Sequence, residues 1–226
     1  SYNTCERPQA GLGAQYFGGK DNDYDVVKAS KEGGIMASDG SLDAWRRVYE
    51  IARGGLEGND AYFKLQGRTP EGELDPDAEV LIDIDNLIDY NMILFYGGNL
   101  DAAITWFGGD RWHNNWYGMR HRSNRQGFQF FIWDAEHTFL KLDENRTGPY
   151  PAGDEYARSN PQWIWQQCLH NAEFRQAVAD RLHKHFYNGG ALTPESIATL
   201  LNKRVNELRL AVICESARWG KPSPYS

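Results

Sequence analysis

The chain has 226 residues, of which 41% are hydrophobic and 24% charged, and this composition indicates a globular protein rather than a disordered one. The length suffices for one domain, or for two small ones, with a well-filled core. The net charge of −7 excludes nucleic acid as the expected partner, because that partner requires a basic face. A nucleotide bound through a divalent metal is compatible with an acidic protein, since the metal supplies local positive charge.

The three cysteines, Cys5, Cys168 and Cys214, have no CxxC spacing, so they indicate neither a disulfide framework nor a zinc site. We expect Cys168 and Cys214 to be buried on helices, and the alternative is one disulfide with one free thiol. No run of about 18 apolar residues occurs, which predicts no membrane span. Because the chain does not begin with Met and its start is no signal peptide, we expect both ends to be cut from a longer protein.

The first half of the chain predicts one short strand and three helices. Apolar residues recur at helical spacing in the helices, and Gly54 and Gly55 end the first of them. The third helix is apolar nearly all round, which indicates burial, and Asp85 is its expected N-cap. The strand is expected at residues 25–30, the helices at 38–53, 59–65 and 83–95, and a surface loop at 68–77.

The second half predicts a β-hairpin followed by helices. Residues 116–120 and 129–133 are typical of strands, with a polar hairpin loop between them. Thr193, followed by Pro194, is typical of a helix start. Helices are expected at residues 161–171, 172–187 and 193–218, after an irregular segment at 143–161. The predicted fold class is therefore α+β, mostly α, with a small β-hairpin.

Asp134 directly follows the apolar run FQFFIW, so its carboxylate should emerge at the end of a strand. A carboxylate in that place can bind a hard cation such as Mg²⁺, and the alternative is an N-cap for the following turn. Glu136 is a candidate ligand for the same metal or for a second one, and its alternative is a solvated charge.

Asp101 follows the sequence GGNL at the end of the predicted buried helix. Such a carboxylate can orient an attacking hydroxyl and accept its proton, or it can form an Asx turn. Asn114 and Asn115 precede the hairpin, and an amide oxygen is a neutral ligand that suits Mg²⁺. Two adjacent asparagines are also ordinary turn residues.

Other chemistries have weaker signals. The sequence has no GxSxG motif for serine hydrolysis, and His113 and His121 have no zinc spacing. Hydrolysis of glycosides by Asp101 and Asp134 stays open, because the sequence does not give their separation. Tryptophans can form a sugar-binding platform, but their spacing favours the core; they are Trp106, Trp112, Trp116, Trp163, Trp165 and Trp219.

Four ordered motifs carry a family resemblance. They are LIDIDNLIDY (residues 81–90), YGGNLD (96–101), HNNWYGMR (113–120) and FFIWDAEHTF (130–139). With matching flanking segments at residues 6–28, 186–196 and 215–220, the chain resembles the bacterial branch of the spore coat protein H-type (CotH) kinases over nearly its whole length. Members of this family are atypical protein kinases.

The resemblance implies a single domain over residues 1–226 with a fold like the C-lobe of a protein kinase. It implies transfer of the ATP γ-phosphate to Ser or Thr hydroxyls of a protein, with Mg²⁺ or Mn²⁺. Asp101 matches the catalytic aspartate of the family, and Asp134 matches the metal-binding aspartate. Asn115, together with Asn114, matches the polar residue that helps to hold the metal.

Two departures from the family pattern bear on the site. Asp101 and Asn115 lie 115 − 101 = 14 residues apart, which is longer than in the shorter members, and we expect this insertion to cover the site. The segment from Glu6 to Pro8 resembles the segment after the last N-lobe strand. The N-lobe, with its phosphate-contacting Lys, is therefore expected to be missing, and Glu6 is expected near the adenine.

The alternative function is a non-catalytic, surface-associated structural or binding module of the same fold, and a third is a carbohydrate-active protein that uses Trp112 and Trp116. The family analogy suggests the envelope or exterior of a bacterium. The sequence identifies neither the acceptor protein nor the oligomeric state.

Overall fold

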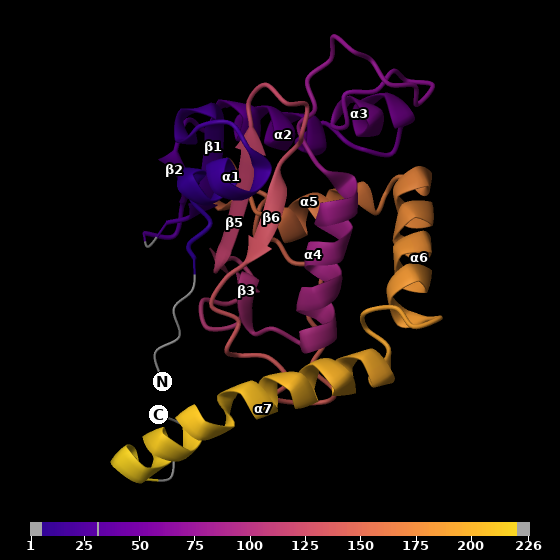
Figure 1. The fold of residues 1–226 in the computed structure, drawn as a ribbon. Coiled ribbons are helices and arrows are strands. Elements are labelled where there is room, and N and C mark those ends of the chain that lie inside the picture. The colour runs from indigo at the N-terminus through magenta and orange to yellow at the C-terminus, as the bar shows by residue number, and fades with distance from the viewer. Residues whose placement is uncertain (1–5, 31, 221–226) are drawn as a thin grey trace. The chain divides into compact units, whose positions relative to one another are not determined.

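The computed structural model describes residues 6–30 and 32–220. It divides into two units (Figure 1), each described here by itself. The larger unit spans Arg7–Val178, and the smaller one comprises Glu6 and the chain from Ala179 onward. The candidate site residues from Asp101 to Glu136 all belong to the larger unit.

The larger unit contains a four-stranded antiparallel sheet in the order β2-β1-β5-β6. A second, two-stranded sheet pairs β3 with β4. The strands are β1 Tyr24–Ala29, β2 Ile35–Asp39, β3 Asp101–Thr105, β4 His113–Asn114, β5 Trp116–His121 and β6 Gln129–Ile132. The predicted hairpin is confirmed as β5 and β6, and the strand predicted at residues 25–30 is confirmed as β1. Strands β3 and β4 and strand β2 were not predicted, and β1 and β2 extend the hairpin into a larger sheet.

Helices cover this sheet and connect its strands. In the larger unit these are α1 Ala10–Phe17, α2 Asp43–Arg53, α3 Asn59–Lys64, α4 Ile84–Gly97 and α5 Pro161–Cys168, with two 3-10 turns, η1 Asp21–Asp23 and η2 Tyr156–Arg158. The α+β class is confirmed. The prediction of a helix from residue 38 is wrong, because residues 35–39 pair with β1 and α2 begins only at Asp43.

The core of the larger unit is centred on Trp45 of α2, which is completely buried. Its ring packs against Trp116, Phe128 and Phe130, with centroid distances of 5.4, 5.5 and 5.9 Å. Its indole N–H donates to Ser159 Oγ at 2.8 Å, so the polar edge of the ring is satisfied as well. This aromatic cluster fixes the β5–β6 hairpin against α2.

Helix α4 supports the loop that leads to Asp101. Its N-cap is Asp83, which accepts a hydrogen bond from Asn86 N at 3.0 Å, so the prediction of Asp85 as the cap is wrong. At the other end Gly98 has φ 57°, a left-handed conformation that glycine adopts without steric strain and that ends the helix.

The smaller unit contains the end of α6 (Ala172–Phe186) and the 26-residue α7 (Pro194–Trp219). Thr193 caps α7 as predicted, accepting from Ser196 N at 3.4 Å. Helix α7 has no buried residue among its members, so the prediction of a buried Cys214 is wrong, whereas Cys168 on α5 is buried as predicted. Cys5 lies outside the described residues.

The predicted burial of the tryptophans is confirmed for Trp116, Trp163 and Trp165. It is wrong for Trp106, Trp112 and Trp219, which are 62%, 38% and 72% exposed. Among the described residues, no helix has the length and apolar character that crossing a membrane requires.

Candidate active site

The candidate site begins at the carboxylate of Asp101, the first residue of β3. Asn114 Nδ2 donates to both carboxylate oxygens at 3.2 Å, and Asn115 Nδ2 donates to Oδ2 at 3.1 Å. The pairing of Ala103 with Asn114 between β3 and β4 brings these residues together. The insertion between Asp101 and Asn115 thus folds into a short ribbon that places the three residues side by side, while their predicted roles stay predictions.

Asn115 and Asp134 lie at the same end of the β5–β6 hairpin. Trp116 pairs with Ile132, so Asn115 directly precedes one strand and Asp134 follows the other by two residues. Both have left-handed backbones, with φ of 49° and 51°, a region that Asn and Asp adopt more readily than most residues. Such conformations concentrate at functional sites.

The segment after Asp134 runs along the end of α4. Leu100 N donates to His137 O at 3.0 Å, and Phe139 N donates to Gly97 O at 2.7 Å. These bonds hold the loop that carries Asp134 and Glu136 against the loop that carries Asp101. The hairpin and the helix end thus form one structural support for the acidic residues, as the sequence predicts.

The acidic residues repel one another. A hydrogen bond with Asp134 and the charge of that residue raise the pKa of Glu136, and the charge of Asp101 adds to this shift. Within the described part of the chain, neither Asp101 nor Asp134 forms an ion pair, and Glu136 has only His137, whose Nε2 is 3.7 Å away. The site therefore carries excess negative charge, which a cation would neutralise.

Carboxylate and amide oxygens are the ligand atoms that Mg²⁺ prefers. No group of three or more His, Cys, Asp or Glu side chains in the described ranges is arranged to hold a metal. A metal at this site would therefore need the amide oxygens as well. Asn115 directs its Nδ2 at Asp101, which leaves Oδ1 as its ligand atom.

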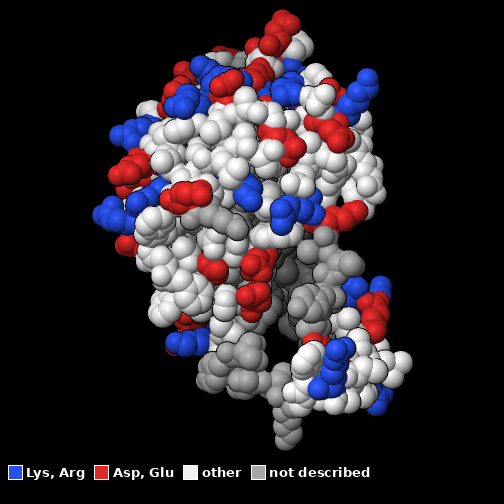
Figure 2. Space-filling model, turned by 90° about the vertical axis from the view of Figure 1, so that its left-hand side faces the viewer, with Lys and Arg blue, Asp and Glu red and all other residues white. Residues whose placement is uncertain are grey.

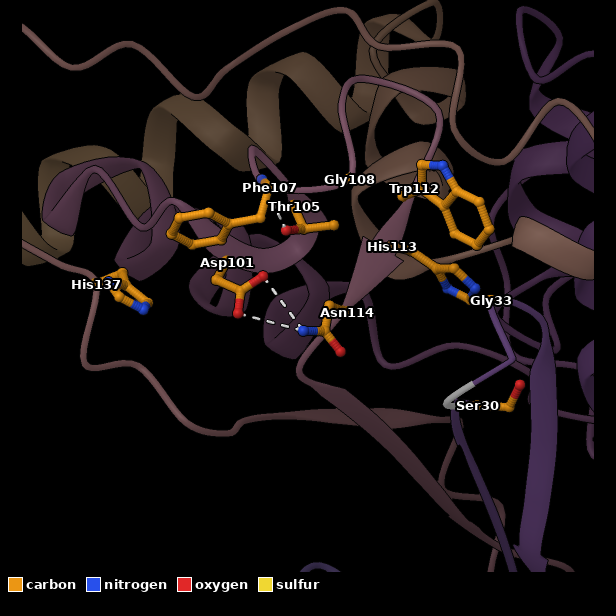
Figure 3. A pocket seen from close by; sticks show the side chains of 10 residues that line it. All are labelled: Ser30, Gly33, Asp101, Thr105, Phe107, Gly108, Trp112, His113, Asn114 and His137. Carbon is orange, nitrogen blue, oxygen red and sulfur yellow. Dashed lines mark hydrogen bonds between the residues drawn. The ribbon is translucent and has the colours of Figure 1, made fainter.

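A cavity of about 580 Å³ opens beside Asp101 (Figure 3). Aromatic side chains on two loops form much of its wall, with Phe107 and Trp112 on the insertion and His137 after β6. The floor contains Asp101 and Asn114, with their hydrogen bonds drawn in Figure 3. Sequence reasoning missed this cavity, because its walls come from segments that no local motif joins.

Another cavity, of about 190 Å³, is lined by both asparagines and shares Asn114 with the first. Its wall includes Arg7 and Lys28, and both are held by aromatic rings. The Arg7 guanidinium lies 5.7 Å from the ring centroid of Trp133, and Lys28 Nζ lies 3.2 Å from the hydroxyl of Tyr117. The sequence analysis did not identify Arg7 or Lys28 as residues of the site, although Lys28 lies in the strand predicted at residues 25–30.

Glu6, expected near the adenine, is grouped with the smaller unit and is exposed, and its role stays a prediction. Figure 2 shows Lys and Arg interspersed with Asp and Glu over the upper part of one face.

Residues 59–225 match the family described as CotH kinase protein. The match covers more than half of the 226 residues, and the chain belongs to this family. The matched range includes Asp101, Asn115 and Asp134, whereas strand β1, which carries Lys28, precedes this range. Neither the curated proteins nor the solved structures compared with the chain gave a match.

Proposed function

We propose that this protein is an ATP-dependent protein kinase that transfers the γ-phosphate to Ser or Thr hydroxyls of a protein. We also propose that the unit spanning residues 7–178 corresponds to a kinase C-lobe of the bacterial branch of the family. The observation that carries the proposal is the convergence of Asp101, Asn115 and Asp134 at one end of the β5–β6 hairpin. Phosphoryl transfer depends mainly on such positioning and on neutralising charge.

Asp101 has the role of orienting the acceptor hydroxyl. The two amides fix its carboxylate from one side, and they leave further lone pairs on its oxygens for a hydroxyl proton. The large cavity opens next to this carboxylate, so an acceptor can reach it from solvent. The hydroxyl proton would pass to Asp101 as the oxygen attacks phosphorus.

Asp134 and Asn115 would hold Mg²⁺, and Asn114 and Glu136 are the additional candidates for ligation. The donor set fits this ion, because it combines unpaired carboxylates with a neutral amide oxygen. When bound, the ion supplies charge neutralisation for the nucleotide phosphates. The pKa of Glu136 is raised by a hydrogen bond with Asp134 and by the charge of that residue, and a bound cation would relieve the second of these effects.

The second cavity would hold the phosphates. Arg7 and Lys28 supply cationic donors, and Ser30 and the two asparagines supply polar ones. Anions are bound by such charged donors. The chain thus offers its own cations beside the acidic cluster, in addition to the N-lobe lysine that the sequence analysis expects to be missing from it.

A thermal-shift titration tests this function. Mn²⁺ with ATP should raise the melting temperature of the wild-type chain, and Asp134→Asn should lose most of that shift. The substitution keeps the shape of the side chain, and Asn tolerates the left-handed backbone at this position. Asp143→Asn, at an exposed residue, is the matched control.

Equal shifts in the wild type and in Asp134→Asn would overturn the assignment of Asp134. A wild-type protein that binds neither Mn²⁺ nor ATP would favour the alternative, a non-catalytic structural or binding module of the same fold.

A further inference from the structure

The aromatic cavity beside Asp101 has features that select a substrate. Its volume is about 580 Å³, within the range typical of sites for small ligands or for a few side chains. The rings of Phe107 and His137 lie 4.9 Å apart, edge to face, so they join the insertion to the segment after Asp134. Phe107 is 57% exposed and Trp112 is 38% exposed, so both rings present apolar surface to solvent.

Most polar groups in the cavity are already occupied by partners in the protein. Thr105 Oγ1 accepts from Phe107 N at 3.1 Å, and Asn114 Nδ2 donates to Asp101. His113 is the exception. Its Nδ1 accepts from Trp116 Nε1 at 3.0 Å, which places the proton of the neutral ring on Nε2, and this buried Nε2 has no hydrogen-bond partner among the described residues.

The occupant is therefore expected to be apolar. A sugar would need many free donors and acceptors for its hydroxyls, because buried polar groups must be paired. Here the free surface is mainly aromatic, and the carboxylate of Asp101 remains as the main polar group for an incoming hydroxyl. The guanidinium of Arg158 lies 4.4 Å from the Trp112 ring, so this ring already holds a cation on one of its faces.

We propose that this cavity binds an apolar or aromatic side chain that neighbours the acceptor Ser or Thr in an extended peptide. The inference rests on the proposed function, because it places the hydroxyl of the acceptor at Asp101. The insertion between Asp101 and Asn115 then determines specificity: Phe107 and Trp112 contact the flanking residue, and Asp101 contacts the hydroxyl. The substrate class is a protein segment in which an apolar residue adjoins the phosphorylated one.

Binding of synthetic peptides, measured by fluorescence anisotropy without nucleotide, tests this inference. The peptides carry one central Ser flanked by Phe, Leu, Gly, Asp or Lys. The wild-type chain should prefer the Phe and Leu peptides, and Phe107→Ala should weaken their binding about tenfold, as is typical when an aromatic contact is removed. Phe139→Ala is the matched control, because Phe139 is 70% exposed and lies outside the cavity wall.

Equal binding of the Phe and Gly peptides by the wild type would overturn the inference. An equal loss in Phe107→Ala and Phe139→Ala would also overturn it, and so would displacement of the Phe peptide by maltoheptaose. Asp134→Asn should keep the peptide preference. If that preference is present but no chain transfers phosphate to the Phe peptide, the proposed function fails while the binding preference stands.

Discussion

Strand β5 carries a charged cluster at each end, and the two clusters differ in how their charges are balanced. At one end Arg120, 6% exposed, donates to Glu79 at 2.8 Å and to Val80 O at 3.0 Å, and it lies 4.0 Å from Asp25. At the other end Asp101 faces the amides of Asn114 and Asn115, Asp134 lies beside Glu136, and the described residues place no cation in an ion pair with Asp101 or Asp134. Opposite charges at the first end stabilise one another, whereas like charges at the second repel.

The directions of the pKa shifts follow this difference. Burial acts to raise the pKa of Glu79, but the hydrogen bond from Arg47 and the charge of Arg120 outweigh it, so the pKa is lowered. The pKa of Glu136 is raised by its hydrogen bond with Asp134 and by the charge of that neighbour. Perturbed carboxylates are frequent at functional sites, and the second cluster is the one to which the proposed function assigns the metal and the acceptor hydroxyl.

The largest expected effect is on catalysis at the unbalanced cluster. Asp101→Asn removes the group that we propose accepts the hydroxyl proton, so the rate of phosphate transfer should fall by about 10²–10⁴. The measurement is transfer of labelled phosphate from ATP to a peptide, with circular dichroism to check the fold. Asp110→Asn, at an exposed residue of the same insertion, should keep the wild-type rate, and comparable losses in both variants would refute the role of Asp101.

The next effect is on stability at the balanced cluster. Arg120→Met leaves the buried Asp25 and the half-buried Glu79 without this partner, and it should lower the free energy of unfolding by about 3 kcal/mol. Arg122→Met is the matched control. Its side chain is 42% exposed although it also pairs with Asp25, at 3.1 Å, so the loss should stay below about 1 kcal/mol. Urea denaturation measures both, and equal losses would contradict the distinction between the two ends.

The sequence predicts those elements and site residues of the two clusters that have a local signal. The apolar runs around β5 and β6, and Thr193 before Pro194, have strong local signals, and the motifs that resemble the family contain Asp101, Asn115 and Asp134. Strand β2 was missed because IMASD lacks the alternation of a half-buried strand. Its conformation depends on pairing with β1, which local propensity does not report.

The parts of the site that the sequence did not reveal are made by long-range packing. Lys28 reaches the asparagines because β1 pairs with β5, which joins Lys28 to Tyr117, 89 residues away. Phe107 and His137 meet across the two loops beside Asp101. No periodicity within one segment indicates such contacts, so the cavities become visible only in the fold.

A third effect concerns pH and the buried His113 beside the acidic cluster. Burial lowers its pKa to about 4, below the ordinary value of about 6.5, so the unfolded chain binds this proton first as pH falls. Stability should be complete above about pH 6.5 and should decline by roughly 3 kcal/mol on reaching about pH 4.

Urea titrations of the wild type and of His113→Gln measure this contribution. The variant should show a shallower decline over that range, with His170→Gln as the control at an exposed position. If His113→Gln kept the wild-type slope, the buried neutral imidazole would not be its origin.

The smallest expected effect is also a dependence of stability on pH, and it concerns Glu136. Its sign is opposite to that of His113, because this contribution is lost as pH rises. Because the folded protein raises the pKa of this carboxyl, the native state binds its proton more tightly than the unfolded chain does. This contribution to stability is present at pH values below the ordinary pKa of Glu and is lost as pH rises through the folded pKa.

Glu136→Gln should remove this decline, and Mn²⁺ should reduce it in the wild type by neutralising the same charges. Melting temperatures between pH 4 and pH 7, with and without Mn²⁺, measure both changes. An unaltered decline in Glu136→Gln would show that repulsion among the carboxylates does not act on stability through this residue.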